Sequence, residues 1–143
     1  MARLPIHFFS EDVSFTLKQK LKIRSWIHQT IISEGYNLGE LSFIFASDEY
    51  VLNINREYLQ HDTYTDIITF DNSEEDKLII GDIFISIDRV RENAANFKVN
   101  EADELHRVMI HGTLHLLGYP DKGKIAKSIM TGKEDHYLSL REF

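Results

Sequence analysis

Hydrophobic and polar residues occur along the chain in short blocks whose spacing predicts strands and helices in turn. Runs rich in β-branched and aromatic residues predict strands over residues 6–9, 41–46, 66–70 and 78–86. Apolar residues at helical spacing predict helices over residues 15–32, 48–59, 87–97, 100–117 and 124–140. The strand at 78–86 is the most apolar run, so we expect both of its faces to be buried.

Polar residues and glycines mark where several of these elements begin and end. Ser47, followed by two acidic residues, predicts an N-cap for the second helix, and Asn100 predicts one for the fourth. Gly118 supplies a stop for the fourth helix, and Pro120 prevents its continuation. The first helix is expected to bury the apolar residues that share one broad arc, Leu17, Leu21, Ile27 and Ile31.

Strands interleaved with helices predict an α/β (α+β) fold, with a small mixed sheet of four strands packed with about five helices. The 143 residues contain no low-complexity tract and no repeat, which predicts one domain over 1–143. Too few apolar residues precede Ser10 for a secretory signal, and no later run approaches the ~20 apolar residues that span a bilayer. We therefore expect a soluble cytoplasmic protein.

The composition restricts the chemistry that the chain can perform. The 16 lysines and arginines against 23 aspartates and glutamates leave a net charge of −7, which argues against bulk electrostatic binding of nucleic acid. Any contact with RNA must then be local. The chain has 0 cysteines, which excludes disulfides, thiol nucleophiles and zinc sites that use cysteine. A metal ion would be held by histidine and carboxylate alone.

Two histidines one helical turn apart are the first candidates for such a site. His111 and His115 lie at i and i+4 of the fourth predicted helix, about 40° apart, on the half that faces the core. Two imidazoles at this spacing can reach one metal ion, as they do in zinc peptidases. The alternative is a pair of core histidines that are hydrogen-bonded separately, which the spacing alone does not exclude.

A third ligand is expected just after this helix. The turn at 118–120 reverses the chain and delivers Asp121, six residues after His115, so the metal helix and its turn have a metzincin-like layout. Gly112 occupies the position at which zincin peptidases carry a glutamate general base, which disfavours a peptidase. The rivals of Asp121 as third ligand are His106, His136, Glu134 and Asp135.

Three blocks, in the same order and with matching spacing, resemble one protein family. His111-Gly-Thr-Leu-His115-Leu-Leu-Gly-Tyr119 looks like the signature of the YbeY family of bacterial endoribonucleases, His-Gly-x-Leu-His-Leu-x-Gly-Tyr-Asp-His. The other two blocks are Thr-Asp-Ile-Ile-Thr-Phe at 65–70 and Gly-Asp-Ile-Phe-Ile-Ser at 81–86. The resemblance covers roughly residues 41–121 and implies that His111 and His115 are metal ligands.

The sequence departs from the family pattern at two positions. Asp121 stands where the family's third histidine ligand falls. A carboxylate also binds Zn²⁺, at about 2.0–2.2 Å, although it makes the ion a weaker Lewis acid than three imidazoles do. Leu59 stands where the family often carries an arginine, which the resemblance implies contacts RNA phosphate. Arg56, close to one helical turn earlier, is the candidate to replace it.

Further candidates lie in the other two blocks. Asp82 shares a strand face with apolar residues, so it is either a catalytic or supporting carboxylate for the metal helix or an ordinary strand residue. Asp66 is open to the same two interpretations. Thr65 and Thr69 share a face, and they either line an RNA groove or simply suit a strand.

The resemblance implies a zinc-dependent endoribonuclease, specific for single-stranded RNA. It would act in the maturation of the 3′ end of small-subunit ribosomal RNA and in ribosome quality control, with one Zn²⁺ held by His111, His115 and Asp121. The expected partners are RNA and the small ribosomal subunit or its assembly factors. The alternatives are an assembly factor whose metal site is structural and, less favoured, a small zinc peptidase. No general base is evident, and the catalytic candidates beside the metal are Arg56 and Asp82.

Overall fold

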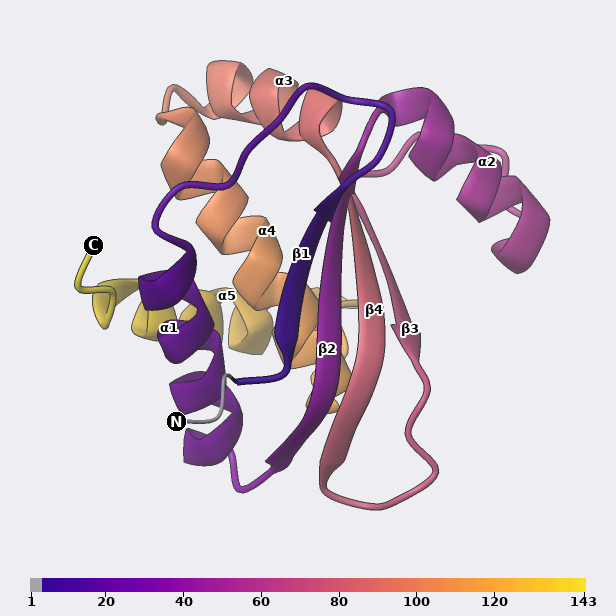
Figure 1. Ribbon diagram of the computed structural model, residues 1–143. Coiled ribbons are helices and arrows are strands. Elements are labelled where there is room, and N and C mark those ends of the chain that lie inside the picture. The colour runs from indigo at the N-terminus through magenta and orange to yellow at the C-terminus, as the bar shows by residue number, and fades with distance from the viewer. Residues whose placement is uncertain (1–3) are drawn as a thin grey trace.

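The computed structural model describes residues 4–143, which form the α+β fold that the pattern predicts (Figure 1). Within that range the strands are β1 (Ile6–Ser10), β2 (Asn37–Ala46), β3 (Ile67–Asp71) and β4 (Leu78–Ser86). The helices are α1 (Lys20–Ser33), α2 (Asp48–Leu59), α3 (Ile87–Phe97), α4 (Glu101–Leu116) and α5 (Lys124–Ser139). Over the same residues, no helix combines the length and the apolar character that a membrane span requires.

The strands form one mixed sheet in the order β1-β2-β4-β3. β1, β2 and β4 run parallel to one another, whereas β3 pairs antiparallel with β4 at the edge. Successive parallel strands are joined through helices, as parallel pairing requires. The antiparallel edge strand matters for function, because it brings the block at 65–70 next to α4.

The main core lies between one face of the sheet and the helices α1, α4 and α5 (Figure 1). On that face Phe43 is paired with Ile83, and Phe45 with Ile85, and all four side chains are almost fully buried. On the opposite face, α2 packs against one end of the sheet. The prediction that β4 is buried on both faces is therefore wrong, and its residues alternate between buried and half-buried positions until the strand meets α3.

The predicted helix caps are confirmed. Ser47 Oγ accepts a hydrogen bond from the backbone N–H of Tyr50 at 3.1 Å, and Asn100 Oδ1 accepts one from Asp103 at 2.7 Å. Gly118 has a φ of 97°, the left-handed conformation in which a glycine ends a helix without steric cost. These local signals set both ends of the helix that carries the histidine pair.

The first helix begins later than predicted, at Lys20. Leu17 is buried but precedes the helix, and Leu21 is 77% exposed, so its expected burial is wrong. The physical reason is that Leu21 lies about 120° around the helix from Ile27, which faces the core. The buried arc is formed by Ile23, Trp26, Ile27, Thr30 and Ile31.

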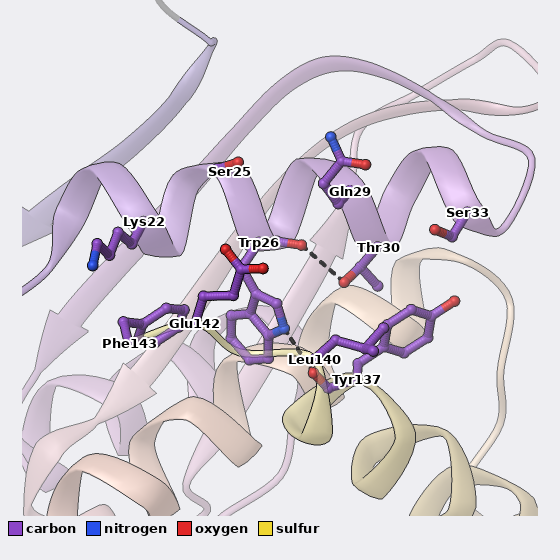
Figure 2. Close-up of a pocket in the computed structure, with 10 residues that line it drawn as sticks. All are labelled: Lys22, Ser25, Trp26, Gln29, Thr30, Ser33, Tyr137, Leu140, Glu142 and Phe143. Atoms are coloured by element: carbon purple, nitrogen blue, oxygen red, sulfur yellow. Dashed lines mark hydrogen bonds between the residues drawn. The ribbon is translucent and has the colours of Figure 1, made fainter.

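Trp26 joins α1 to the C-terminal segment. Its Nε1–H donates to the carbonyl oxygen of Tyr137 on α5 at 2.8 Å. These two elements line a pocket of about 220 Å³. Trp26 lies in it between α1 and the end of α5 (Figure 2). None of the site residues predicted from the sequence lines this pocket. The contact matters here because it fixes α5 relative to α1.

Candidate metal centre

α4 presents both predicted histidines to a cleft beside β3. The rings of His111 and His115 lie almost perpendicular, at 84°, with their centroids 4.6 Å apart. Their side chains are 21% and 25% exposed, so the pair lies at the edge of the core rather than inside it. A metal ion held by these rings would be accessible to a substrate in the cleft.

Gly112 lets α4 approach the sheet closely at this point. A Cβ atom at this position would lie 2.6 Å from Ile67 Cδ1 and 3.0 Å from Ile83 Cγ2. The first contact is shorter than real Cβ atoms show and the second is tight, so a larger residue would require neighbouring side chains to shift. The glycine that stands in place of a zincin glutamate therefore has a packing role.

The turn after α4 brings the third predicted ligand to the pair. Asp121 Oδ2 lies 3.3 Å from His111 Nε2 and 3.1 Å from His115 Nε2. One ligand atom from each of the three residues lies within 4.8 Å of the others. Burial raises the pKa of the Asp121 carboxyl, but the two histidines together lower it by more, so its pKa lies below the ordinary value. The carboxylate is therefore ionised where it meets the two rings.

The hydrogen bonds of His111 fit a bound cation. Its Nδ1–H donates a hydrogen bond to Glu134 Oε2 at 2.6 Å. In the neutral ring, Nε2 then carries no hydrogen, and its lone pair points at the Asp121 carboxylate. Two acceptors face each other, and a proton or a metal ion between them makes the contact favourable. Burial lowers the pKa of His111, but the hydrogen bond to Glu134 and the charges of the nearby carboxylates raise it above its ordinary value.

Glu134, which the sequence offered as an alternative third ligand, contacts Nδ1 of His111 instead. It lies on α5, and its side chain is only 9% exposed. Its other oxygen accepts a hydrogen bond from Arg107 Nη1 at 2.7 Å. A carboxylate in this position fixes the tautomer and orientation of a ligating histidine and increases its basicity. The motif at 111–119 carries no signal for Glu134, which lies 23 residues after His111 on another helix.

The remaining rival ligands lie elsewhere. His106 is buried beside Trp26, and its Nδ1 accepts a hydrogen bond from Arg141 at 2.7 Å. His136 is exposed, with its ring against that of Tyr137. Asp135 pairs with Arg107 at 2.6 Å. In the described part of the chain, the group able to hold a metal consists of His111, His115 and Asp121.

A pocket of about 410 Å³ adjoins the histidine pair and contains both predicted threonines. Thr65 and Thr69 line it together with Leu59, the residue at the family's arginine position. His61 and Lys122 also line it, and neither was singled out in the sequence. Their signal was weak, because a single histidine and a single lysine in a loop carry no pattern. The cleft therefore offers hydroxyl, imidazole and ammonium groups beside the metal ligands.

Two other sequence candidates lie outside this cleft. Arg56 forms an ion pair with Asp62 at an exposed position and does not line the pocket. Asp82 has its backbone on β4 between Gly81 and Ile83, which face α4, so its side chain lies on the opposite face of the sheet. There it accepts a hydrogen bond from Asn72 at 3.1 Å. The structure does not place either residue beside the histidine pair.

The half-buried Asp66 and the buried Glu104 share a cavity with His111. Asp66 and Glu104 line a second cavity, of about 250 Å³, together with Glu134 and His111. Burial raises the pKa of Asp66, an effect that the charge of His111 partly offsets. Burial also raises the pKa of Glu104, and the charge of Asp66 adds to it. Asp66 also lines the cleft beside the histidine pair.

Comparisons with known proteins found a matching family model and similar relatives. The family model described as Endoribonuclease YbeY matches residues 6–141. The chain is 54% identical over 138 residues to Endoribonuclease YbeY of Cytophaga hutchinsonii, covering 96% of each sequence. It is 48% identical over 132 residues to the Flavobacterium psychrophilum protein of the same name, covering 92% of this chain and 94% of the relative.

The fold has a counterpart among solved structures. The solution structure of TM1509 from Thermotoga maritima superposes with a TM-score of 0.65 at 27% identity, covering 94% of this chain and 87% of that one. The family model and the curated relatives extend over the whole of the sheet and the histidine pair. The chain therefore belongs to the YbeY family of endoribonucleases.

Proposed function

We propose that this protein is a cytoplasmic, zinc-dependent endoribonuclease that cuts single-stranded RNA during maturation of the 3′ end of small-subunit ribosomal RNA and in ribosome quality control. The observation that carries the proposal is the convergence of His111, His115 and Asp121 beside a cleft. Relatives named as endoribonucleases support RNA as the substrate. The small ribosomal subunit or its assembly factors are the proposed partners.

The donor set supports zinc as the metal. Catalytic zinc sites use three protein ligands drawn from histidine nitrogen, carboxylate oxygen and cysteine sulfur, and the three residues here supply two nitrogens and one oxygen. Zinc held there supplies a Lewis acid, which lowers the pKa of water and offsets negative charge on a phosphodiester. The charge of Asp121 moderates that acidity relative to a site of three neutral imidazoles.

The side chains around the ligands divide the remaining tasks. Glu134 accepts a hydrogen bond from Nδ1–H of His111, which leaves the lone pair of Nε2 available to a metal ion. Lys122 supplies a positive charge for RNA phosphate at the cleft, a role for which Arg56 is less suited because it pairs with Asp62, and His61 adds an imidazole to the cleft wall. Thr65 offers a hydroxyl on the cleft wall.

The peptidase alternative has little support. A zincin-type peptidase needs a carboxylate next to the first histidine as general base. Gly112 stands there and offers no carboxylate, and a Cβ atom at this position would crowd Ile67 and Ile83. A ribosome-assembly factor with a structural metal site has the same ligands, so experiment must separate it from the enzyme.

The test combines elemental analysis with cleavage assays. Protein purified without added metal is expected to hold about one equivalent of zinc and to cut single-stranded RNA with the sequence of the small-subunit 3′ end. Duplex RNA and a peptide substrate are expected to remain intact, and a chelator is expected to abolish RNA cleavage. His111→Ala and His115→Ala should each lose zinc and cleavage together, because each removes one of three ligands.

His136→Ala is the matched control, since this exposed histidine lies outside the ligand group. It should keep wild-type zinc content and activity. A wild-type protein without stoichiometric metal, or full cleavage by both ligand variants, would overturn the proposal. Zinc bound without cleavage of any substrate would favour the assembly factor.

A further inference from the structure

Glu34, the residue that follows α1, receives hydrogen bonds from three side chains. Tyr119 Oη donates to its Oε1 at 2.6 Å, and Tyr137 Oη donates to its Oε2. Lys133 Nζ also donates to Oε2, at 3.1 Å, and lies 5.4 Å from the centre of the Tyr119 ring. The Glu34 side chain is 12% exposed. We refer to these four residues as the Glu34 cluster.

The cluster anchors the turn that carries the third metal ligand. Tyr119 precedes Asp121 by two residues, and its backbone N–H donates to the carbonyl oxygen of Leu114 at 3.1 Å. Pro120, Asp121 and Lys122, all in the described part of the chain, form no backbone hydrogen bond. The position of the Asp121 carboxylate therefore depends on how firmly Tyr119 is held.

The same cluster reaches the other side of His111. Lys133 and Tyr137 lie one turn apart on α5, and Lys133 is the neighbour of Glu134, which contacts His111 Nδ1. Burial raises the pKa of Glu34, but the hydrogen bonds from both tyrosines and from Lys133 lower it below its ordinary value. An ionised carboxylate is the partner that three donors require.

We propose that Glu34 is a positioning residue for the metal centre: through the hydroxyl of Tyr119 it holds the turn at 118–121 so that Asp121 meets His111 and His115. This inference rests on the proposed metal site. It predicts that the cluster contributes to metal affinity, beyond any contribution to the stability of the fold, because a displaced Asp121 would no longer meet both histidines. Loss of a group that orients a metal ligand typically alters affinity about 10–100-fold.

The experiment measures the zinc dissociation constant of the full chain by competition with a chromophoric chelator. Tyr119→Phe, which removes one hydroxyl, is expected to weaken zinc binding about tenfold. The effect should disappear when Tyr119→Phe is introduced into an Asp121→Ala background, because the hydroxyl acts through Asp121. Melting temperatures of the metal-free proteins are recorded in parallel. Glu34→Gln, which preserves side-chain volume, gives the same comparison independently.

Tyr64→Phe is the matched control. Tyr64 Oη also donates to a glutamate, Glu49, at 2.6 Å, but at an exposed site, and Tyr64 does not line the cleft that contains the metal ligands. Its zinc affinity should equal that of wild type. Equal zinc affinity in wild type and Tyr119→Phe, or an equal loss in both Asp121 backgrounds, would overturn the inference and leave the metal site intact. A wild-type protein that binds no zinc would overturn the proposed function itself.

Discussion

Two histidines on α4, five residues apart, have pKa values that their surroundings shift in opposite directions. His111 lies between two carboxylates, which raise its pKa against the effect of burial. His106 is buried beside Trp26 and Arg141, and burial together with the guanidinium charge lowers its pKa to about 4. Residue type alone therefore did not separate a candidate ligand from a neutral core histidine, whereas the charge of the nearest side chains does.

The neutral state of His106 predicts acid sensitivity. Its pKa rises from about 4 in the folded chain to 6.5 in the unfolded chain, so the unfolded chain binds more protons between these values. The free energy of unfolding should fall as the pH drops from 6.5 to about 4, by up to about 3 kcal/mol from this residue. Denaturant titration of the metal-free protein in chelator at several pH values measures the loss.

His106→Gln isolates this contribution, because glutamine still accepts a hydrogen bond from Arg141 but does not titrate. The carboxylates titrate equally in both proteins, so the difference between the two stability curves belongs to His106. That difference should change between pH 7 and pH 4.5. Parallel curves would contradict the low pKa.

At the scale of secondary structure elements, three separate segments build the metal centre. α4 carries the histidine pair, the turn after it carries Asp121, and α5 carries Glu134. The spacing of the pair was readable from the helix period, and the turn was readable from its glycine and proline. The contact between α5 and α4 was not, because the weak periodicity of α5 does not specify which of its acidic residues faces His111.

The close packing of α4 on the sheet gives a prediction at this scale. In Gly112→Ala, Ile67 Cδ1 can rotate away, but the fully buried Ile83 has little room to move. Overpacking of this kind costs about 1–3 kcal/mol, against which the higher helix propensity of alanine recovers at most about 1 kcal/mol. We expect a net loss of unfolding free energy in denaturant titration.

Gly132→Ala on α5 is the control for helix propensity. A Cβ atom there meets no other atom within 4 Å, so this variant should be as stable as wild type or more stable by up to about 1 kcal/mol. If Gly112→Ala gains as much stability as Gly132→Ala, the close approach of α4 to the sheet is not the reason for this glycine.

The whole molecule has a charge of −7, yet its family acts on RNA. Among the described residues that line the cleft, Lys122 is the one lysine or arginine. The electrostatic part of RNA binding should therefore be small and concentrated at the metal centre.

Salt dependence tests this distribution of charge. Each phosphate contact on single-stranded RNA adds a slope of about −0.7 to the plot of log binding constant against log salt concentration. We expect a shallow slope for the wild type, measured in chelator so that the RNA stays intact. Lys122→Ala should reduce its magnitude by about 0.7, whereas Lys127→Ala, an exposed lysine on α5, should leave it unchanged. No change in Lys122→Ala would rule out its phosphate contact.

Local sequence signals were enough to predict the order of the elements, the helix caps, the spacing of His111 and His115 and the return of Asp121. These features depend on interactions within a few residues, such as a cap, a helical turn or a glycine stop. Packing between distant segments determined the rest. Glu134 meets His111 across 23 residues, and Glu34 meets Tyr119 across 85. Such contacts depend on how α1 and α5 pack against α4, which hydrophobic periodicity does not encode.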